Sequence, residues 1–188
     1  TATIVFSSIP FVVAHLFGPN EVTIYNITNS IFNIPIMVMN LITAPLLPLV
    51  THAYTRKDYH WIKIMLRRMN IISALITCGI IFIVFLSPYI FHIWIGDKLI
   101  IPFNLSIFIG IYSIINVIII PFSIFINSIG KIRVLVLLAP VGIVLFIGFS
   151  ILLSDMLCNL IAIPISLSIN SLIGLFIIPI TLKRHNLI

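Results

Sequence analysis

The sequence predicts an all-α fold, a polytopic membrane bundle of about six transmembrane helices. Hydrophobic residues make up 61% of the 188-residue chain and charged residues 7%, whereas an ordinary soluble domain is about one quarter charged. The mean hydropathy is +1.31, and the apolar residues fall into runs that approach the roughly 20 residues a helix needs to cross a bilayer. Helices are expected because a lone strand in lipid leaves its backbone hydrogen bonds unsatisfied. We therefore treat residues 1–188 as a single transmembrane domain.

The first two predicted helices differ in their proline content. The first covers about 1–17 and ends at the turn GPNE. Because the chain opens on this apolar run without Met or a basic leader, we expect it to be the interior of a longer protein. The second helix covers about 22–51 and contains Pro35, Pro45 and Pro48. Proline removes a backbone donor, so this helix is expected to bend or break.

Four more helices are predicted over 71–93, 104–128, 132–153 and 159–182. Before the first of them lies the segment DYHWIKIMLRRMN (58–70), whose apolar and basic residues fall on opposite sides of a helix. It is expected to lie in the cytoplasmic headgroup layer with Asp58 as its N-cap. We interpret it as a connector and topology anchor, with binding of an anionic lipid as the alternative. The candidate lipid-headgroup residues are Arg56, Lys57, Lys63, Arg67, Arg68, Lys131 and Arg133.

Connections rich in basic residues alternate along the chain with connections that have few or none. Nine of the ten Lys and Arg residues lie in 52–70, in 129–133 or in the tail, and the tenth, Lys98, lies in the connection 94–103. The positive-inside rule then places the first three segments, and the C-terminus, in the cytoplasm. This pattern explains the net charge of +6 through membrane topology, so nucleic acid is not an expected partner.

Asparagines form a stripe on the second predicted helix. Asn26, Asn29, Asn33 and Asn40 fall within an arc of about 60° at 100° per residue. Such a face is expected to line a hydrated substrate path or to bond neighbouring helices, at about 0.6–2 kcal/mol per bond. Polar residues on the fourth and sixth predicted helices add to the substrate-path candidates, which are Asn26, Asn29, Asn33, Asn40, Tyr112, Asn116, Asn127 and Asn170.

The sequence shows no signature of catalysis. It contains no HExxH, no GxSxG, no glycine-rich phosphate loop and no carboxylate pair at catalytic spacing. Cys78 and Cys158 do not form a CxxC or metal-ligand pattern. We therefore predict that the protein is not an enzyme and that it has no metal site and no cofactor. Amides, hydroxyls and proline-broken helices suit the passage of a hydrogen-bonding solute such as a sugar.

Four stretches carry a resemblance to a known family. They are LFGPNEVTIYNI (16–27), PLLPLVTHAYTRKDYHWIK (45–63), IWIGD (93–97) and GIYSIINVIIIPFSIFINSIGKIR (110–133). Their order and spacing resemble the second half of polysaccharide repeat-unit flippases. These are the O-antigen and capsule transporters of the multidrug/oligosaccharidyl-lipid/polysaccharide exporter superfamily. The likeness covers about 10–185.

The resemblance implies a two-lobe transporter, with this chain as its C-terminal lobe of six helices. It implies flipping of undecaprenyl-diphosphate-linked oligosaccharide repeat units across the bacterial inner membrane by alternating access, for lipopolysaccharide or capsule biosynthesis. The implied partners are the lipid bilayer, the polyprenyl-diphosphate-linked glycan and other polysaccharide-assembly membrane proteins. Alternatives are a drug or other lipid exporter of the same superfamily, a multi-span polysaccharide polymerase or acyltransferase, and a structural or assembly subunit.

Overall fold

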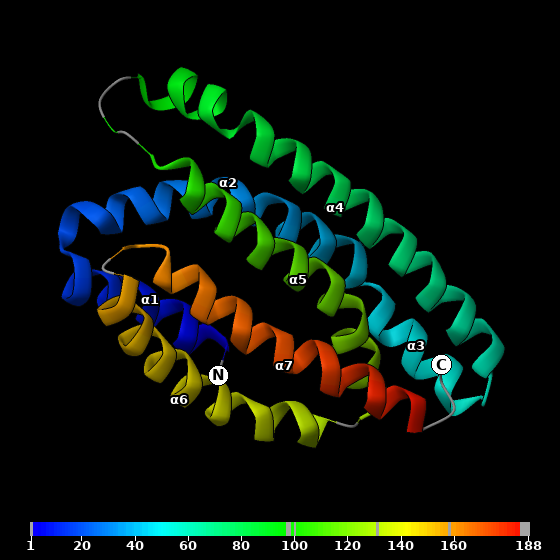
Figure 1. Ribbon diagram of the computed structural model, residues 1–188. Coiled ribbons are helices and arrows are strands. Elements are labelled where there is room, and N and C mark those ends of the chain that lie inside the picture. The colour runs from blue at the N-terminus through cyan, green and yellow to red at the C-terminus, as the bar shows by residue number, and fades with distance from the viewer. Residues whose placement is uncertain (1, 97–98, 100, 131, 158, 185–188) are drawn as a thin grey trace.

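The computed structural model is an elongated bundle of α-helices (Figure 1). It describes residues 2–96, 99, 101–130, 132–157 and 159–184, without the side chains of 2–8, 12, 132–139, 155–157 and 176–184. These residues contain no strand, which confirms the predicted all-α class. The described helices are α1 (Ala2–Phe17), α2 (Pro19–Thr43), α3 (Leu46–Thr55), α4 (Tyr59–Ile95), α5 (Phe103–Ser128), α6 (Ile132–Leu157) and α7 (Ala162–Arg184).

The long segment predicted over 22–51 is divided into two helices, α2 and α3. The break falls at Pro45, which is the N-cap of α3. Pro35 lies inside α2 without ending it. Pro48 sits in the first turn of α3, where a backbone N–H has no partner within the helix to lose. One of the three prolines therefore breaks the helix.

The structure differs from our expectation of a separate surface helix over 58–70. Residues 59–70 are instead the first turns of the 37-residue helix α4, and no proline or glycine near residue 70 would end a helix there. The N-cap prediction is confirmed, since the Asp58 side chain accepts a hydrogen bond from Trp61 N–H at 3.0 Å. The apolar face also differs, because Ile62, Leu66 and Met69 are buried against α3 and α5 rather than facing lipid.

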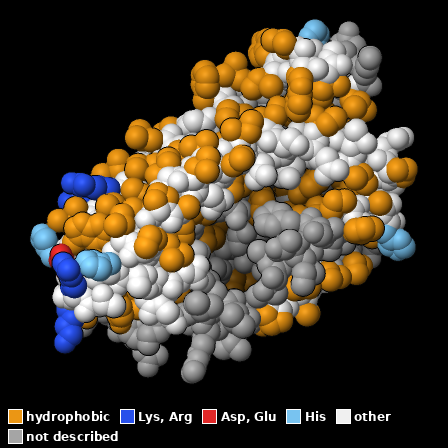
Figure 2. All heavy atoms as spheres, turned by 180° about the vertical axis from the view of Figure 1, so that it is seen from behind, with side chains coloured by type: hydrophobic (Ala, Val, Ile, Leu, Met, Phe, Trp, Pro, Cys, Tyr) orange, Lys and Arg blue, Asp and Glu red, His pale blue; other side chains and the backbone are white. Residues whose placement is uncertain are grey.

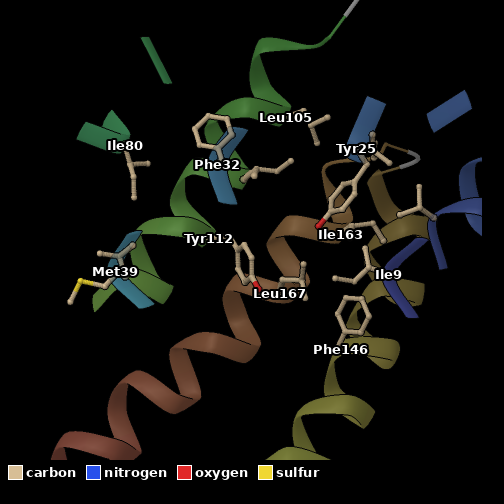
Figure 3. Close-up of a cluster of buried hydrophobic side chains, with 14 residues drawn as sticks. Ile9, Tyr25, Phe32, Met39, Ile80, Leu105, Tyr112, Phe146, Ile163 and Leu167 are labelled. Atoms are coloured by element: carbon tan, nitrogen blue, oxygen red, sulfur yellow. The ribbon is translucent and has the colours of Figure 1, made fainter. Parts of the chain in front are cut away.

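Helix α5 lies at the centre of the bundle, in contact with α2, α3, α4 and α7 (Figure 1). The larger hydrophobic cluster joins residues of α1, α2, α4, α5, α6 and α7 with the turn before α7. Figure 3 shows Tyr25 of α2 and Tyr112 of α5 pointing toward α7, beside Ile163 and Leu167. The larger cluster contains Tyr25, Phe32 and Met39 of α2 and thereby holds this helix in a defined rotation about its own axis.

The outer surface of the bundle is apolar. Leu75, Phe85 and Ile93 on α4 are 68%, 71% and 85% exposed. Among the described residues, three helices are long and apolar enough to cross a membrane, namely α2, α4 and α5. Shorter apolar stretches occupy 140–154 of α6 and 162–175 of α7. Exposed apolar surface on this scale fits a lipid environment.

Candidate functional site

Helix α2 presents three different faces along its length. One is buried in the bundle and includes Tyr25, Phe32 and Met39. A second consists of exposed apolar side chains such as Met37 and Leu41, which are 63% and 67% exposed. At 100° per residue, a third sector of about 60° lies between these two faces. This sector, which we call the amide stripe, holds Asn26, Asn29, Asn33 and Asn40.

The side-chain amides of the stripe have no hydrogen-bond partner among the described residues. Asn26, Asn33 and Asn40 are exposed and Asn29 is half-buried. No hydrogen bond joins any of the four side-chain amides to another residue that the structure describes. Bonding between helices within this described bundle therefore does not account for the stripe. No described residue occupies the donors and acceptors of the four amides, which suits them to bond to water or to a ligand.

The hydroxyl groups of α2 behave differently from its amides. Thr28, Ser30 and Thr43 each donate to the carbonyl four residues earlier in the helix, at 2.8, 2.7 and 2.8 Å. This back-bonding is the usual solution for Ser and Thr in a helix within an apolar medium. The longer asparagine side chains point outward instead. The stripe is thus a row of amides whose donors and acceptors remain available.

Two of the three candidates on α5, Tyr112 and Asn116, are buried or bonded inside the bundle. Tyr112 is 5% exposed and belongs to the large hydrophobic cluster. Asn116 Nδ2 donates to the Tyr112 carbonyl at 2.8 Å, so this amide bonds to its own helix. Asn127 is half-buried near the end of α5. Burial or bonding therefore separates Tyr112 and Asn116 from the amide stripe, whereas Asn127 is half-buried like Asn29.

Asn170 on α7 packs closely against α6. A Cβ atom built on Gly142 would lie 2.9 Å from Asn170 Oδ1, closer than real Cβ atoms approach, and 3.2 Å from Nδ2. Gly142 therefore makes room for the amide, a pairing that was not predicted from the sequence. A lone glycine within an apolar run is the signal that marks such a close approach.

A second polar surface lies at the junction of α3 and α4. Arg56, Lys57, Lys63, Arg67 and Arg68 are all exposed there, and Figure 2 shows Lys and Arg side chains gathered at one end of the molecule. We call these five residues the basic corner. The other two candidates of this kind, Lys131 and the side chain of Arg133, lie outside the described residues.

Most of α2 and all of α3 lack charged side chains, since no Asp, Glu, Lys or Arg occurs from Val22 to Thr55 and Glu21 lies in the first turn of α2. The amide stripe is therefore an uncharged polar surface. Among the described residues, no group of three or more His, Cys, Asp or Glu is placed to hold a metal ion. The stripe offers hydrogen bonds and neutral contact area rather than acid–base or metal chemistry.

Comparison with known proteins gives one match. The family model described as MatE matches residues 2–152, which run from α1 through most of α6 and contain both the amide stripe and the basic corner. Comparison with curated proteins and with solved structures found no match.

Proposed function

The chain belongs to the MatE family and is thus a membrane exporter of the multidrug/oligosaccharidyl-lipid/polysaccharide exporter superfamily, and we propose that its cargo is a lipid-linked oligosaccharide. On this proposal the protein flips polyprenyl-diphosphate-linked repeat units across the bacterial inner membrane for surface polysaccharide synthesis. A transporter of this family performs no covalent chemistry on its cargo, in line with the expectation that the chain is not an enzyme.

The amide stripe is the observation that carries this proposal. Each asparagine offers one acceptor oxygen and two donor hydrogens, the set that sugar hydroxyls require in place of water. Four amides along α2, without a partner among the described residues, supply such groups over several turns of the helix. A path of this kind replaces the hydration of an oligosaccharide stepwise, without the strong attachment that a buried charge would create.

The apolar face of α2 explains why a lipid-linked cargo is favoured. The exposed residues Met37 and Leu41 lie beside the amide stripe on the same helix. A substrate with a glycan head and a polyprenyl tail can follow both faces at once, with its sugars on the amides and its tail in lipid. A cationic drug would gain less, because α2 offers no carboxylate beyond Glu21 in its first turn.

The orientation follows from the charge pattern. We place the basic corner, residues 129–133 and the C-terminus in the cytoplasm, because cytoplasmic connections of membrane proteins are enriched in Lys and Arg. The cargo would then enter from the side of the basic corner. The end of α2 that carries Glu21 would face the periplasm.

The double substitution Asn29→Leu with Asn33→Leu in the native gene tests the proposal. Each lost amide removes about 0.5–1.5 kcal/mol of net hydrogen bonding. The two together should slow flipping about 5- to 150-fold if the loss falls on the transport barrier. Surface polysaccharide should fall and lipid-linked repeat units should accumulate, while the amount of protein in the membrane stays normal.

Asn70→Leu with Asn104→Leu is the matched control, since both amides are exposed but lie on α4 and α5, away from the stripe. This control should export at the wild-type rate. Wild-type export by the stripe variant at normal protein levels would exclude the stripe as the cargo path. Lost resistance to cationic dyes with unchanged polysaccharide would instead identify a drug exporter.

A further inference from the structure

The exposed face of α4 is basic in the first turns of the helix and apolar in the turns that follow. Lys63, Arg67 and Arg68 are exposed in its first turns, and Ile71 and Leu75, which follow, are 56% and 68% exposed and apolar. From residue 71 to the end of the helix at Ile95 no Lys, Arg, Asp or Glu occurs. A lipid-facing helix with this pattern passes from hydrocarbon to a polar layer near residue 70.

The length of α4 agrees with that boundary. Its 37 residues correspond to about 55 Å at a rise of 1.5 Å per residue. The hydrocarbon core is about 30 Å thick, or about 40–45 Å with both headgroup layers. Residues 71–95 are enough to cross the hydrocarbon core, so the preceding three turns extend through the headgroup layer. Arg67 and Arg68 then lie level with the lipid phosphates.

The turn before α4 holds two further cations in place. Asp58 N–H bonds to the Ala53 carbonyl and Lys57 N–H to the Tyr54 carbonyl, each at 3.0 Å. Together these bonds form the helix-ending arrangement that usually places glycine at the left-handed position. Here that position is Lys57, at φ 60°. Arg56 and Lys57 are therefore displayed on a compact turn.

Packing beneath the turn makes the corner rigid. The rings of Tyr54 and Tyr59 meet edge to face across it, with their centroids 6.1 Å apart. Below them, Val50 of α3 and Ile62 of α4 are fully buried in the smaller hydrophobic cluster, with Phe125 of α5 nearly so. The cations thus stand on a packed base that does not need to reorganise when an anion binds.

Among the described residues the basic corner has no matching negative charge. Asp58, the carboxylate within this part of the chain, already bonds to the Trp61 backbone, and no ion pair joins the five basic residues to another described residue. Lys63 and Arg67 are four residues apart on one helix face, where like charges repel. Such an arrangement becomes favourable beside an external anion.

We propose that the basic corner binds the phosphate groups of anionic phospholipids in the surrounding leaflet and thereby fixes the depth of α4 in the membrane. The occupant follows from three observations together, namely the unpaired cations, the packed turn and the apolar face that continues from them along the same helix. A soluble nucleic acid or acidic protein would use the cations but not the apolar face. The proposal does not depend on which cargo the protein exports.

The test compares lipid binding by the purified full-length protein and by a variant with Lys63→Gln and Arg67→Gln. The probes are phosphatidylglycerol and phosphatidylcholine, added to the protein in a neutral detergent, with bound lipid counted by native mass spectrometry. Each basic residue near an anionic surface contributes about 1 kcal/mol. The variant should therefore bind phosphatidylglycerol about 30-fold more weakly, while phosphatidylcholine binding stays unchanged.

The matched control exchanges the same two side chains with retention of charge, Lys63→Arg with Arg67→Lys, and should bind like the wild type. If the double glutamine variant does not accumulate, Lys63→Gln alone should still weaken binding about fivefold. Equal binding of both lipids by the wild type, or equal binding of phosphatidylglycerol by wild type and variant, overturns the proposal. An equal thermal stabilisation by inorganic phosphate alone would also overturn it, because the site would then recognise free phosphate.

Discussion

Gly110 of α5 lies where three helices meet, and its replacement by alanine tests the packing that positions α2. The new Cβ would lie 2.6 Å from Val84 Cγ2 of α4 and 3.4 Å from Phe32 Cε1 of α2. Non-bonded carbons pack at about 3.5–4.0 Å, so the contact with Val84 is about 1 Å too short. Val84 is β-branched and has few rotamers to escape into. The helices must therefore move apart locally.

The expected change in the free energy of unfolding is the difference between two opposing effects. Overpacking of this kind costs about 1–3 kcal/mol, and replacing glycine by alanine within a helix gains about 0.8–1 kcal/mol. We expect Gly110→Ala to destabilise the protein by about 0–2 kcal/mol. In a Val84→Ala background the obstructing methyl is gone, so the same substitution should be neutral or stabilising. The coupling between the two substitutions is then about 1–3 kcal/mol.

The assay is thermal unfolding, in one detergent, of the wild type, Gly110→Ala, Val84→Ala and the double variant. Each kcal/mol of destabilisation lowers the unfolding temperature by about 2–4 °C for a chain of this length. Gly79→Ala is the control, because this glycine of α4 has no atom within 4 Å of a built Cβ, and it should not lower the unfolding temperature. Additive effects of Gly110→Ala and Val84→Ala would refute the packing described here. So would a rise in unfolding temperature for Gly110→Ala alone.

Two further predictions concern the contact between α6 and α7 and the topology. Gly142→Ala should lower the unfolding temperature because of its approach to the Asn170 amide, and Asn170→Ala should reduce that loss; an unchanged loss would separate the two residues. With both native cysteines replaced, a cysteine at Lys98 should react with an impermeant maleimide in spheroplasts and one at Lys131 should be protected. The opposite labelling pattern would reverse the orientation inferred from the basic residues.

The polar residues of α2 and those of α5 have different surroundings, and the sequence did not predict this difference. Helical periodicity grouped the four asparagines of α2 on one side, and it grouped Tyr112, Asn116 and Asn127 of α5 in the same way. Periodicity assigns residues to a face but does not say what that face meets. In the structure Asn116 bonds to its own helix and Tyr112 enters the core. The asparagine side chains of the stripe on α2 neither bond to their own helix nor join the core.

Residues 58–70 also show that periodicity does not say what a face contacts, here for an apolar face. Their amphipathic pattern is real, but an apolar face can be buried by lipid or by other helices, and the pattern is identical in both cases. Contact with α3 and α5 decided the outcome, because Leu46 and Phe125 cover the apolar side of the first turns of α4. Only the exposed basic side then remains to meet the membrane surface.

The sequence by itself determined the all-α membrane class, the break within 22–51 and the side of α2 on which its amides gather. These properties follow from hydropathy, from the missing backbone donor of proline and from the 3.6-residue period, all of which are local. The tertiary structure decided which polar faces remain without partners and which close approaches require Gly110 and Gly142. Those properties depend on contacts between residues far apart in the chain; a glycine in an apolar run signals a close approach but does not identify the residue that approaches it.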